Sequence, residues 1–235
     1  MINTKRENKE GYNAITIGDY KLYAVNGNTD QFHIKKPYAK VMKYVEMLLQ
    51  MELDRFKVYP KDPEVPFKFS NTIEMIAYDI KDFEGFNIYS LLDTKLVIEE
   101  IHSHVKFCVQ VIDTLELIPS EGSVPHMTFY VNEWLFNFCL LYNDPRIVSK
   151  LMSALLLTSA EKNLFKLALE NDNVYISLED IAYALALSKS FTTNPRMVTK
   201  YVVKTIEGIN SKINCNLCYS KGYDGRKVVS LKFNF

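Results

Sequence analysis

The order of apolar and polar residues predicts short strands at the start of the chain and helices after them. Residues 14–17, 21–25 and 31–34 alternate with the two-residue period of strands and are separated by turn residues, so they predict a small antiparallel meander. Pro37 favours the start of a helix, because proline has no amide N–H and the first turn of a helix needs none. The apolar pattern predicts further helices over 72–81, 131–142 and 146–156.

The longest regular pattern of this first part lies within residues 93–117. Apolar side chains recur there every three or four positions, which is the period of one helix face. We interpret this face as a dimerisation surface; the alternative is a central helix that packs inside its own domain. The residues assigned to the dimerisation surface are Ile98, Ile101, Val105, Ile112 and Leu115.

The last third of the chain contains three helix starts and a hairpin. Three pairs of residues mark the starts: Thr158 with Glu161, Ser177 with Asp180, and Asn194 with Pro195. The third helix is predicted over 195–213. Two strand-like runs, 216–220 and 227–233, then flank Gly225, which supplies the positive φ of a hairpin tip. Three helices followed by a hairpin predict a winged helix-turn-helix.

These elements predict a mainly α protein of the α+β type with two domains, which a length of 235 residues allows. Residues 1–143 are expected to form an N-terminal α+β domain with an interaction or dimerisation role. It combines the small β-meander with several helices. Residues 144–235 are expected to form the winged helix-turn-helix, with three helices and a β-hairpin wing.

Charge is unevenly distributed along a chain whose total, 28 Lys and Arg against 28 Asp and Glu, is zero. Residues 1–150 carry 17 basic and 21 acidic side chains, net −4, and residues 151–235 carry 11 and 7, net +4. Cations that recur every four residues on the third helix form one stripe, which is typical of a helix that enters the major groove of DNA. The predicted DNA contacts are Arg196, Lys200 and Lys204 on the helix, the polar residues Thr193, Asn194 and Thr199, and the hairpin cations Lys221, Arg226 and Lys227.

The same region resembles a known family of DNA-binding domains. The motifs are Leu157-Thr158-x-x-Glu161, Ile176-Ser177-x-x-Asp180-Ile181, Val198-x-x-Tyr201-Val202, Lys212-Ile213 and Gly222-Tyr223. They are similar to the winged-helix effector domain of OmpR/PhoB/ToxR-type transcription regulators. The resemblance covers about a third of the chain. It implies DNA binding through the third helix, contact by the wing, and contact with RNA polymerase from the loop over 188–193.

Other chemistry finds little support in the sequence. The eight glycines form neither a dinucleotide fingerprint nor a phosphate loop, so no cofactor is expected, and no catalytic constellation points to an enzyme. Cys215 and Cys218 form a C-x-x-C without a second pair, and His102 and His104 diverge on a helix, so no metal site is expected. Aromatic residues of the first part could line a ligand pocket; they are Tyr12, Tyr20, Tyr23, Phe32, Phe67 and Phe69.

The sequence thus favours a transcriptional regulator that binds specific duplex DNA as a homodimer. The alternatives are a plasmid or phage replication initiator that binds origin repeats, and a winged helix used for protein contacts without DNA. The chain has neither a signal-peptide core nor a run of 18 apolar residues, so we expect a cytoplasmic protein with no membrane span. The four cysteines are expected to be reduced.

Overall fold

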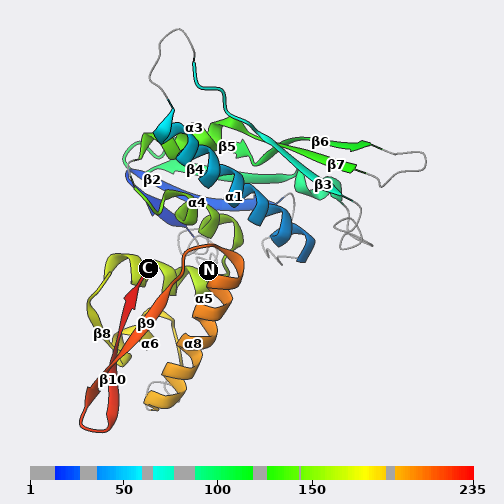
Figure 1. The fold of residues 1–235 in the computed structure, drawn as a ribbon. Coiled ribbons are helices and arrows are strands. Elements are labelled where there is room, and N and C mark those ends of the chain that lie inside the picture. Colours follow the sequence, from blue (N-terminus) through cyan, green and yellow to red (C-terminus); the bar gives the residue numbers. More distant parts are fainter. Residues whose placement is uncertain are drawn as a thin grey trace, which may run out of the picture. The chain divides into compact units, whose positions relative to one another are not determined.

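The computed structural model describes residues 14–26, 36–59, 66–76, 88–118, 126–142, 144–188 and 194–235 (Figure 1). The chain forms two compact units, one of Thr16–Leu156 and one that contains Leu157–Phe235. The boundary therefore follows helix α4 (Ile147–Leu156) instead of preceding it at residue 144. The reason is that α4 packs against helix α1 (Lys36–Val58) and strand β2 (Tyr20–Asn26) of the first unit.

Two antiparallel sheets form the framework of the first unit. The four-stranded sheet has the order β1 (Ile15–Ile17), β2, β4 (Thr94–Glu100) and β5 (Lys106–Gln110). The three-stranded sheet has the order β3 (Thr72–Ile76), β7 (His126–Val131) and β6 (Ile112–Ile118). Val111 alone separates β5 from β6, so the chain passes directly from the edge of one sheet to the edge of the other.

Helices α1, α3 (Glu133–Leu141) and α4 bury the apolar sides of these sheets, and a short 3-10 helix, η3 (Ile88–Leu91), precedes β4. Helix α1 packs against α3, α4 and β3. Aromatic residues occupy the core: Phe69 and Phe67 stack on Phe136, with ring centroids 4.6 and 5.6 Å apart, and Tyr20 meets Phe138 edge-on. These rings pack against one another and not around a ligand pocket. Tyr12 and Phe32 lie outside the described residues.

The prediction of a mainly α fold is wrong. The described residues contain ten strands in three antiparallel sheets beside six α-helices, so the chain is a mixed α and β protein. The predicted helix over 93–117 is instead β4, a turn, β5 and β6. Strand β3 likewise occupies 72–76, where a helix was expected. The rest of that helix, 77–81, and the third meander strand, 31–34, lie outside the described residues.

The predicted dimerisation face is wrong as well, because the helix on which it was placed does not form. Ile98 and Ile112 are fully buried, on β4 of one sheet and β6 of the other. Val105 is exposed in the turn after β4, and Ile101 and Leu115 are half-buried in different elements. Because these five residues do not share a surface, they cannot form a dimer interface of the kind predicted.

The described residues of the second unit form three helices and one three-stranded antiparallel sheet. Its elements are α5 (Ser159–Glu170), β8 (Tyr175–Ser177), α6 (Leu178–Ala184), α8 (Pro195–Lys212), β9 (Cys218–Asp224) and β10 (Lys227–Asn234). The strand order is β8-β10-β9, so the sequence prediction missed β8, which pairs with β10 in addition to the hairpin. Each helix contacts the other two, and the fully buried residues between them and the sheet include Leu164, Ile181, Val202, Ile209 and Phe233.

Glu161 joins the start of α5 to the end of α8. Its carboxylate accepts hydrogen bonds from the backbone N–H and the hydroxyl of Thr158, at 2.7 and 2.9 Å. The Lys212 ammonium donates to both of its oxygens, at 2.8 and 2.6 Å. A Cβ on Gly208 would lie 2.6 Å from a Glu161 oxygen, so the glycine leaves room for the carboxylate against α8. We call this set of contacts the Glu161 bridge.

Replacing Glu161 with Ala should destabilise the second unit. The change removes the cap of α5 and leaves the half-buried Lys212 without its carboxylate, which we expect to lower the free energy of unfolding by about 1–3 kcal/mol. Urea unfolding followed by circular dichroism measures the effect. The matched control is Glu170→Ala, which removes an exposed pair with Lys166 at 3.9 Å and should change stability by less than about 0.5 kcal/mol. Equal effects of the two variants would contradict the role of the bridge.

Candidate nucleic-acid interface

Helix α8 begins where local capping chemistry dictates. Asn194 has an extended backbone, and its Oδ1 accepts hydrogen bonds from the amides of Arg196 and Met197, at 3.2 and 3.4 Å. Pro195 occupies the first helical position, where no amide N–H is required. The first turn contains no acidic residue, so the positive end of the helix dipole is not neutralised within it.

The two sides of α8 differ sharply in character. Val198, Val202 and Ile209 are buried, and their positions define the inner side of the helix. Arg196, Lys200 and Lys204 follow one another at four-residue intervals on the opposite side and are exposed. We call these three residues the cationic face of α8. It spans about 12 Å along the helix at 1.5 Å per residue.

The β9–β10 hairpin carries the second group of cations. Gly225 at its tip has φ +57°, as a two-residue hairpin loop requires of its first residue. Lys221, Arg226 and Lys227 are exposed, and we call them the hairpin cations. Tyr223, beside the tip on β9, is exposed as well.

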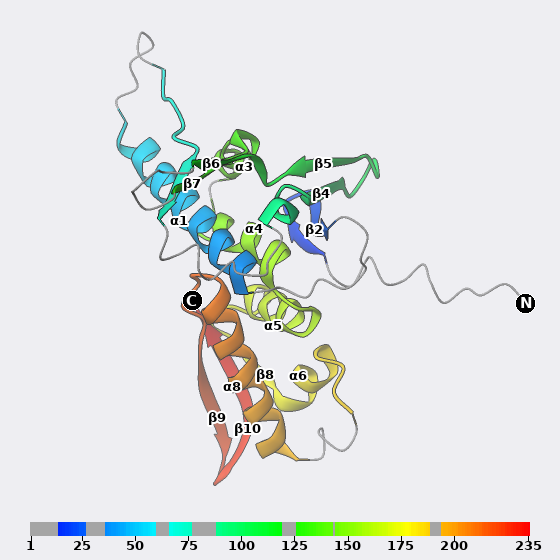
Figure 2. The same cartoon turned by 90° about the vertical axis from the view of Figure 1, so that its right-hand side faces the viewer.

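The N-terminal end of α8 and the hairpin tip lie at the same end of the second unit. Figures 1 and 2, which differ by a quarter turn, both show the orange helix and the red hairpin running side by side toward that end. The cationic face occupies the first half of α8. Arg226 and Lys227 lie at the hairpin tip next to the exposed Asp224, and Lys221 lies further along β9, opposite Leu231. The two groups therefore present their charges on one end of the same unit.

Several cations elsewhere in the structure form ion pairs, and in the part of the chain that the structure describes the cations predicted to contact DNA do not. Within the described residues, none of the cationic face or the hairpin cations forms an ion pair or side-chain hydrogen bond. Elsewhere, Lys212 pairs with Glu161, Lys150 with Asp144, Lys57 with Asp54 and Arg55 with Glu52. The cations predicted to contact DNA are thus exposed to solvent and without a carboxylate partner in the described chain.

The polar residues predicted to contact DNA differ from the cations, because two of them already make hydrogen bonds with the backbone of α8. Asn194 is exposed, but its carbonyl oxygen already caps α8. The hydroxyl of Thr199 donates to the carbonyl of Pro195 at 2.9 Å, so this side chain is partly engaged with its own helix. Thr193 lies outside the described residues.

Asn210 is a positioning residue that the sequence analysis missed. Its amide group donates to the carbonyl of Leu217 at 2.7 Å, and its Oδ1 accepts from the amide of Leu217 at 2.9 Å and from the thiol of Cys215 at 3.4 Å. This pair of bonds to one backbone unit ties the last turns of α8 to the segment that leads into β9. Asparagine has a low helix propensity and is therefore unusual within a helix. This is the one local signal that could have identified Asn210.

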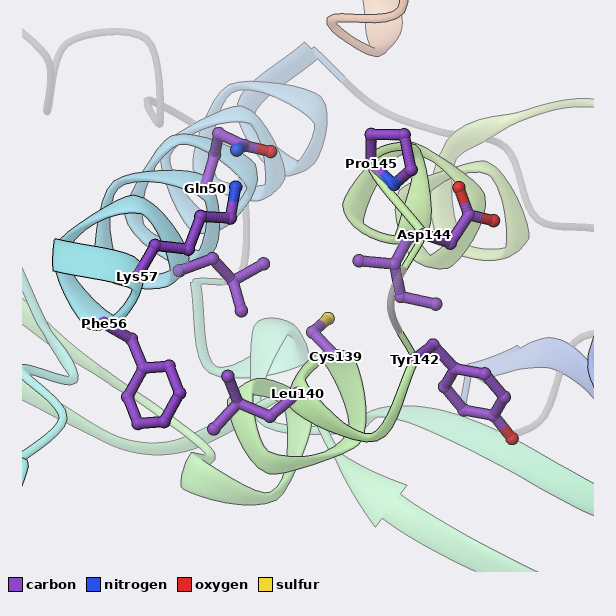
Figure 3. A pocket seen from close by; sticks show the side chains of 10 residues that line it. Gln50, Phe56, Lys57, Cys139, Leu140, Tyr142, Asp144 and Pro145 are labelled. Atoms are coloured by element: carbon purple, nitrogen blue, oxygen red, sulfur yellow. The ribbon is translucent and has the colours of Figure 1, made fainter. Parts of the chain in front are cut away.

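A cavity of about 280 Å³ lies in the first unit, between α1 and the segment that joins α3 to α4 (Figure 3). Of its polar lining residues, Asp144 is bonded to Lys150 and Lys57 to Asp54. Burial raises the pKa of the Cys139 thiol to about 12, so this thiol is protonated and unreactive at neutral pH. Among the described lining residues, the thiol is therefore not poised as a nucleophile, and Asp144 and Lys57 are held in ion pairs.

The described residues hold no metal-binding group either. No three His, Cys, Asp or Glu side chains of the described chain lie together as ligands would. All four cysteines are free, and Cys215 and Cys218 bond separately to Asn210 and to the carbonyl of Asn234. Within the described ranges, no helix has both the length and the apolar character that a bilayer span needs.

No protein-family model matches the sequence, and no curated protein is significantly similar to it.

Replacing Asn210 with Ala should loosen the connection to β9 and lower the free energy of unfolding by about 1–2 kcal/mol. The change removes the two hydrogen bonds to Leu217 and the one from Cys215, and the better helix propensity of alanine offsets only part of this loss. We expect the amide of Leu217 to exchange with deuterium at least about fivefold faster, since 1 kcal/mol corresponds to roughly that factor. Ser211→Ala is the control, because the hydroxyl of Ser211 donates to the carbonyl of Gly208 within the same helix. Unchanged exchange at Leu217 would contradict the positioning role.

Proposed function

We propose that this chain binds double-stranded DNA through its second unit and acts as a sequence-specific transcriptional regulator. Helix α8 lies in the major groove, and the β9–β10 hairpin lies on the neighbouring phosphates. The observation that carries the proposal is the gathering of six exposed cations, on two elements, at one end of the unit. None of them has a carboxylate partner among the described residues.

The dimensions of the cationic face support this placement. It extends over about 12 Å of α8, a length comparable to the width of the major groove of B-form DNA. Lysines at this spacing reach phosphates on the groove walls, and Arg196, at the N-terminal end, can make the bidentate contact that distinguishes guanine. The unneutralised N-terminal dipole of α8 adds a further attraction for phosphate.

The hairpin cations support a second contact outside the groove. Arg226 and Lys227 lie at the exposed tip, and Lys221 lies on β9 opposite Leu231. Phosphate contacts of this kind fix the orientation of a protein on the duplex and leave sequence readout to the helix. The hairpin therefore orients the protein on the phosphates, and the helix reads the sequence.

A single helix in the groove samples only a few base pairs, so we also propose that the chain binds as a homodimer on two half-sites. A regulator of this kind protects one site with two related halves. A replication initiator, which can use the same contacts, protects a series of direct repeats. Mapping the protected DNA therefore separates the two roles.

The double substitution Lys200→Ala/Lys204→Ala should weaken binding to all duplexes. Each lost phosphate contact lowers the slope of log affinity against log salt by about 0.9, so the slope should fall by nearly 2. We expect affinity to fall roughly 10- to 100-fold at 0.1 M salt, because each contact contributes on the order of 1 kcal/mol. The melting temperature should change little, since both side chains are exposed. Fluorescence anisotropy with a labelled duplex over a salt series measures both quantities.

The matched control is Lys95→Ala/Lys166→Ala, which removes the same net charge from exposed positions on β4 and α5. It should leave most of the affinity and the slope intact. Identical behaviour of the two double variants would mean that binding follows net charge and not the cationic face. Failure of the wild-type protein to bind duplex DNA at low salt would exclude the proposed function.

A further inference from the structure

Helix α1 has one side that is exposed within the part of its unit that the structure describes. Val41, Val45 and Leu49 are fully buried and define the inner side of the helix. The opposite side carries a line of exposed residues at helical spacing: Lys43, Met47, Met51, Asp54 and Val58. We call this line the α1 stripe.

The apolar members of the stripe are unusually open to solvent. Met47, Met51 and Val58 are 56, 58 and 81% exposed. Methionine adapts its flexible, polarisable side chain to varied partners and is frequent on surfaces that bind other proteins. A helix face that exposes two methionines one turn apart therefore has the composition of a contact surface.

The order of charges along the stripe indicates what would cover it. Lys43 lies one turn before Met47, and Asp54, which also pairs with Lys57, lies nearly one turn after Met51, so a cation and a carboxylate flank the two methionines. A second α1 laid antiparallel on the first places Met47 opposite the partner's Met51. The same arrangement brings Lys43 to the partner's Asp54, whereas a parallel pair would bring like charges together.

We propose that the α1 stripe is the surface through which two copies of this chain associate, with their α1 helices antiparallel about a twofold axis between Met47 and Met51. An isologous interface requires a surface that is complementary to itself, and the stripe meets this condition. Two-fold symmetry makes each contact twice, so two methionine pairs are flanked by two pairs of opposite charges.

Asp54 retains the capacity for this contact although it has neighbours on its own helix. Lys57 donates to its Oδ1 at 2.8 Å, and Gln50 donates to both oxygens at 3.3 and 3.2 Å. A carboxylate accepts about four hydrogen bonds, and the Asp54 side chain is 58% exposed. Lys43 of a second copy can therefore bond to it without displacing either neighbour.

The size of the stripe predicts a dissociable dimer. Lys43 and Val58 are roughly 22 Å apart along the helix axis, which gives an interface at the small end of the known range. An interface of this size class is typical of weak, reversible association. This proposal does not depend on DNA binding, because the association is measured with the protein alone.

Sedimentation velocity of the full chain without DNA, over about 1–200 µM, tests the proposal. The wild-type protein should shift from monomer to dimer across this range. Lys43→Glu, which sets like charges against each other at both ends, should raise the dissociation constant at least about tenfold. The double exchange Lys43→Glu/Asp54→Lys restores opposite charges in the reversed order and should return the constant to within about threefold of wild type.

Two further variants complete the design. Met47→Lys/Met51→Lys should abolish the dimer, and Lys95→Glu, an exposed residue on β4, should leave it unchanged. The charge exchange separates a true contact from misfolding, because a protein unfolded by Lys43→Glu would not be rescued by a second substitution. A wild-type chain that stays monomeric at 200 µM overturns the proposal. So does a dimer that ignores both Lys43→Glu and the methionine variant, or a charge exchange that fails to restore association.

Discussion

The burial of one side of α8 determines the direction in which the candidate interface points. Val202 and Ile209 are inaccessible to solvent, and exposing either would cost about 1.5–3 kcal/mol. Once these residues are held inside, the geometry of a helix turns positions 196, 200 and 204 away from the core. The Glu161 bridge then holds the far end of the same helix through Lys212. Apolar packing therefore occupies one side of α8, and the exposed charges occupy the other.

Elements with chemical markers at their ends were predictable from the sequence. The helix expected from Asn194 and Pro195 begins there, and the hairpin expected at Gly225 turns there with positive φ. Caps and tight turns depend on residues next to one another, so a single sequence contains the information. The exposure of Arg196, Lys200 and Lys204 followed from the same helix, since its apolar positions define the opposite side.

The error over 93–117 shows where local patterns become ambiguous. Two strands joined by a turn can reproduce helical spacing, because each turn resets the alternation of apolar residues. The turn after β4 contains His104 with φ +57°, which interrupts the alternation between Ile98 and Val109. Pairing of β4 with β2, some seventy residues earlier, selects strands over a helix. No window of local sequence contains that partner. The Asn210 contact was equally invisible, since it depends on where the chain returns after α8.

The contact made by Asn210 has a consequence for the response of the second unit to its surroundings. It joins helix to hairpin with a neutral amide, which neither titrates in the ordinary pH range nor attracts counterions. The cations that face outward are screened by dissolved salt, whereas the hydrogen bonds between Asn210 and Leu217 are not. A change of ionic strength therefore alters the electrostatic potential of this surface while the contact between helix and hairpin stays the same.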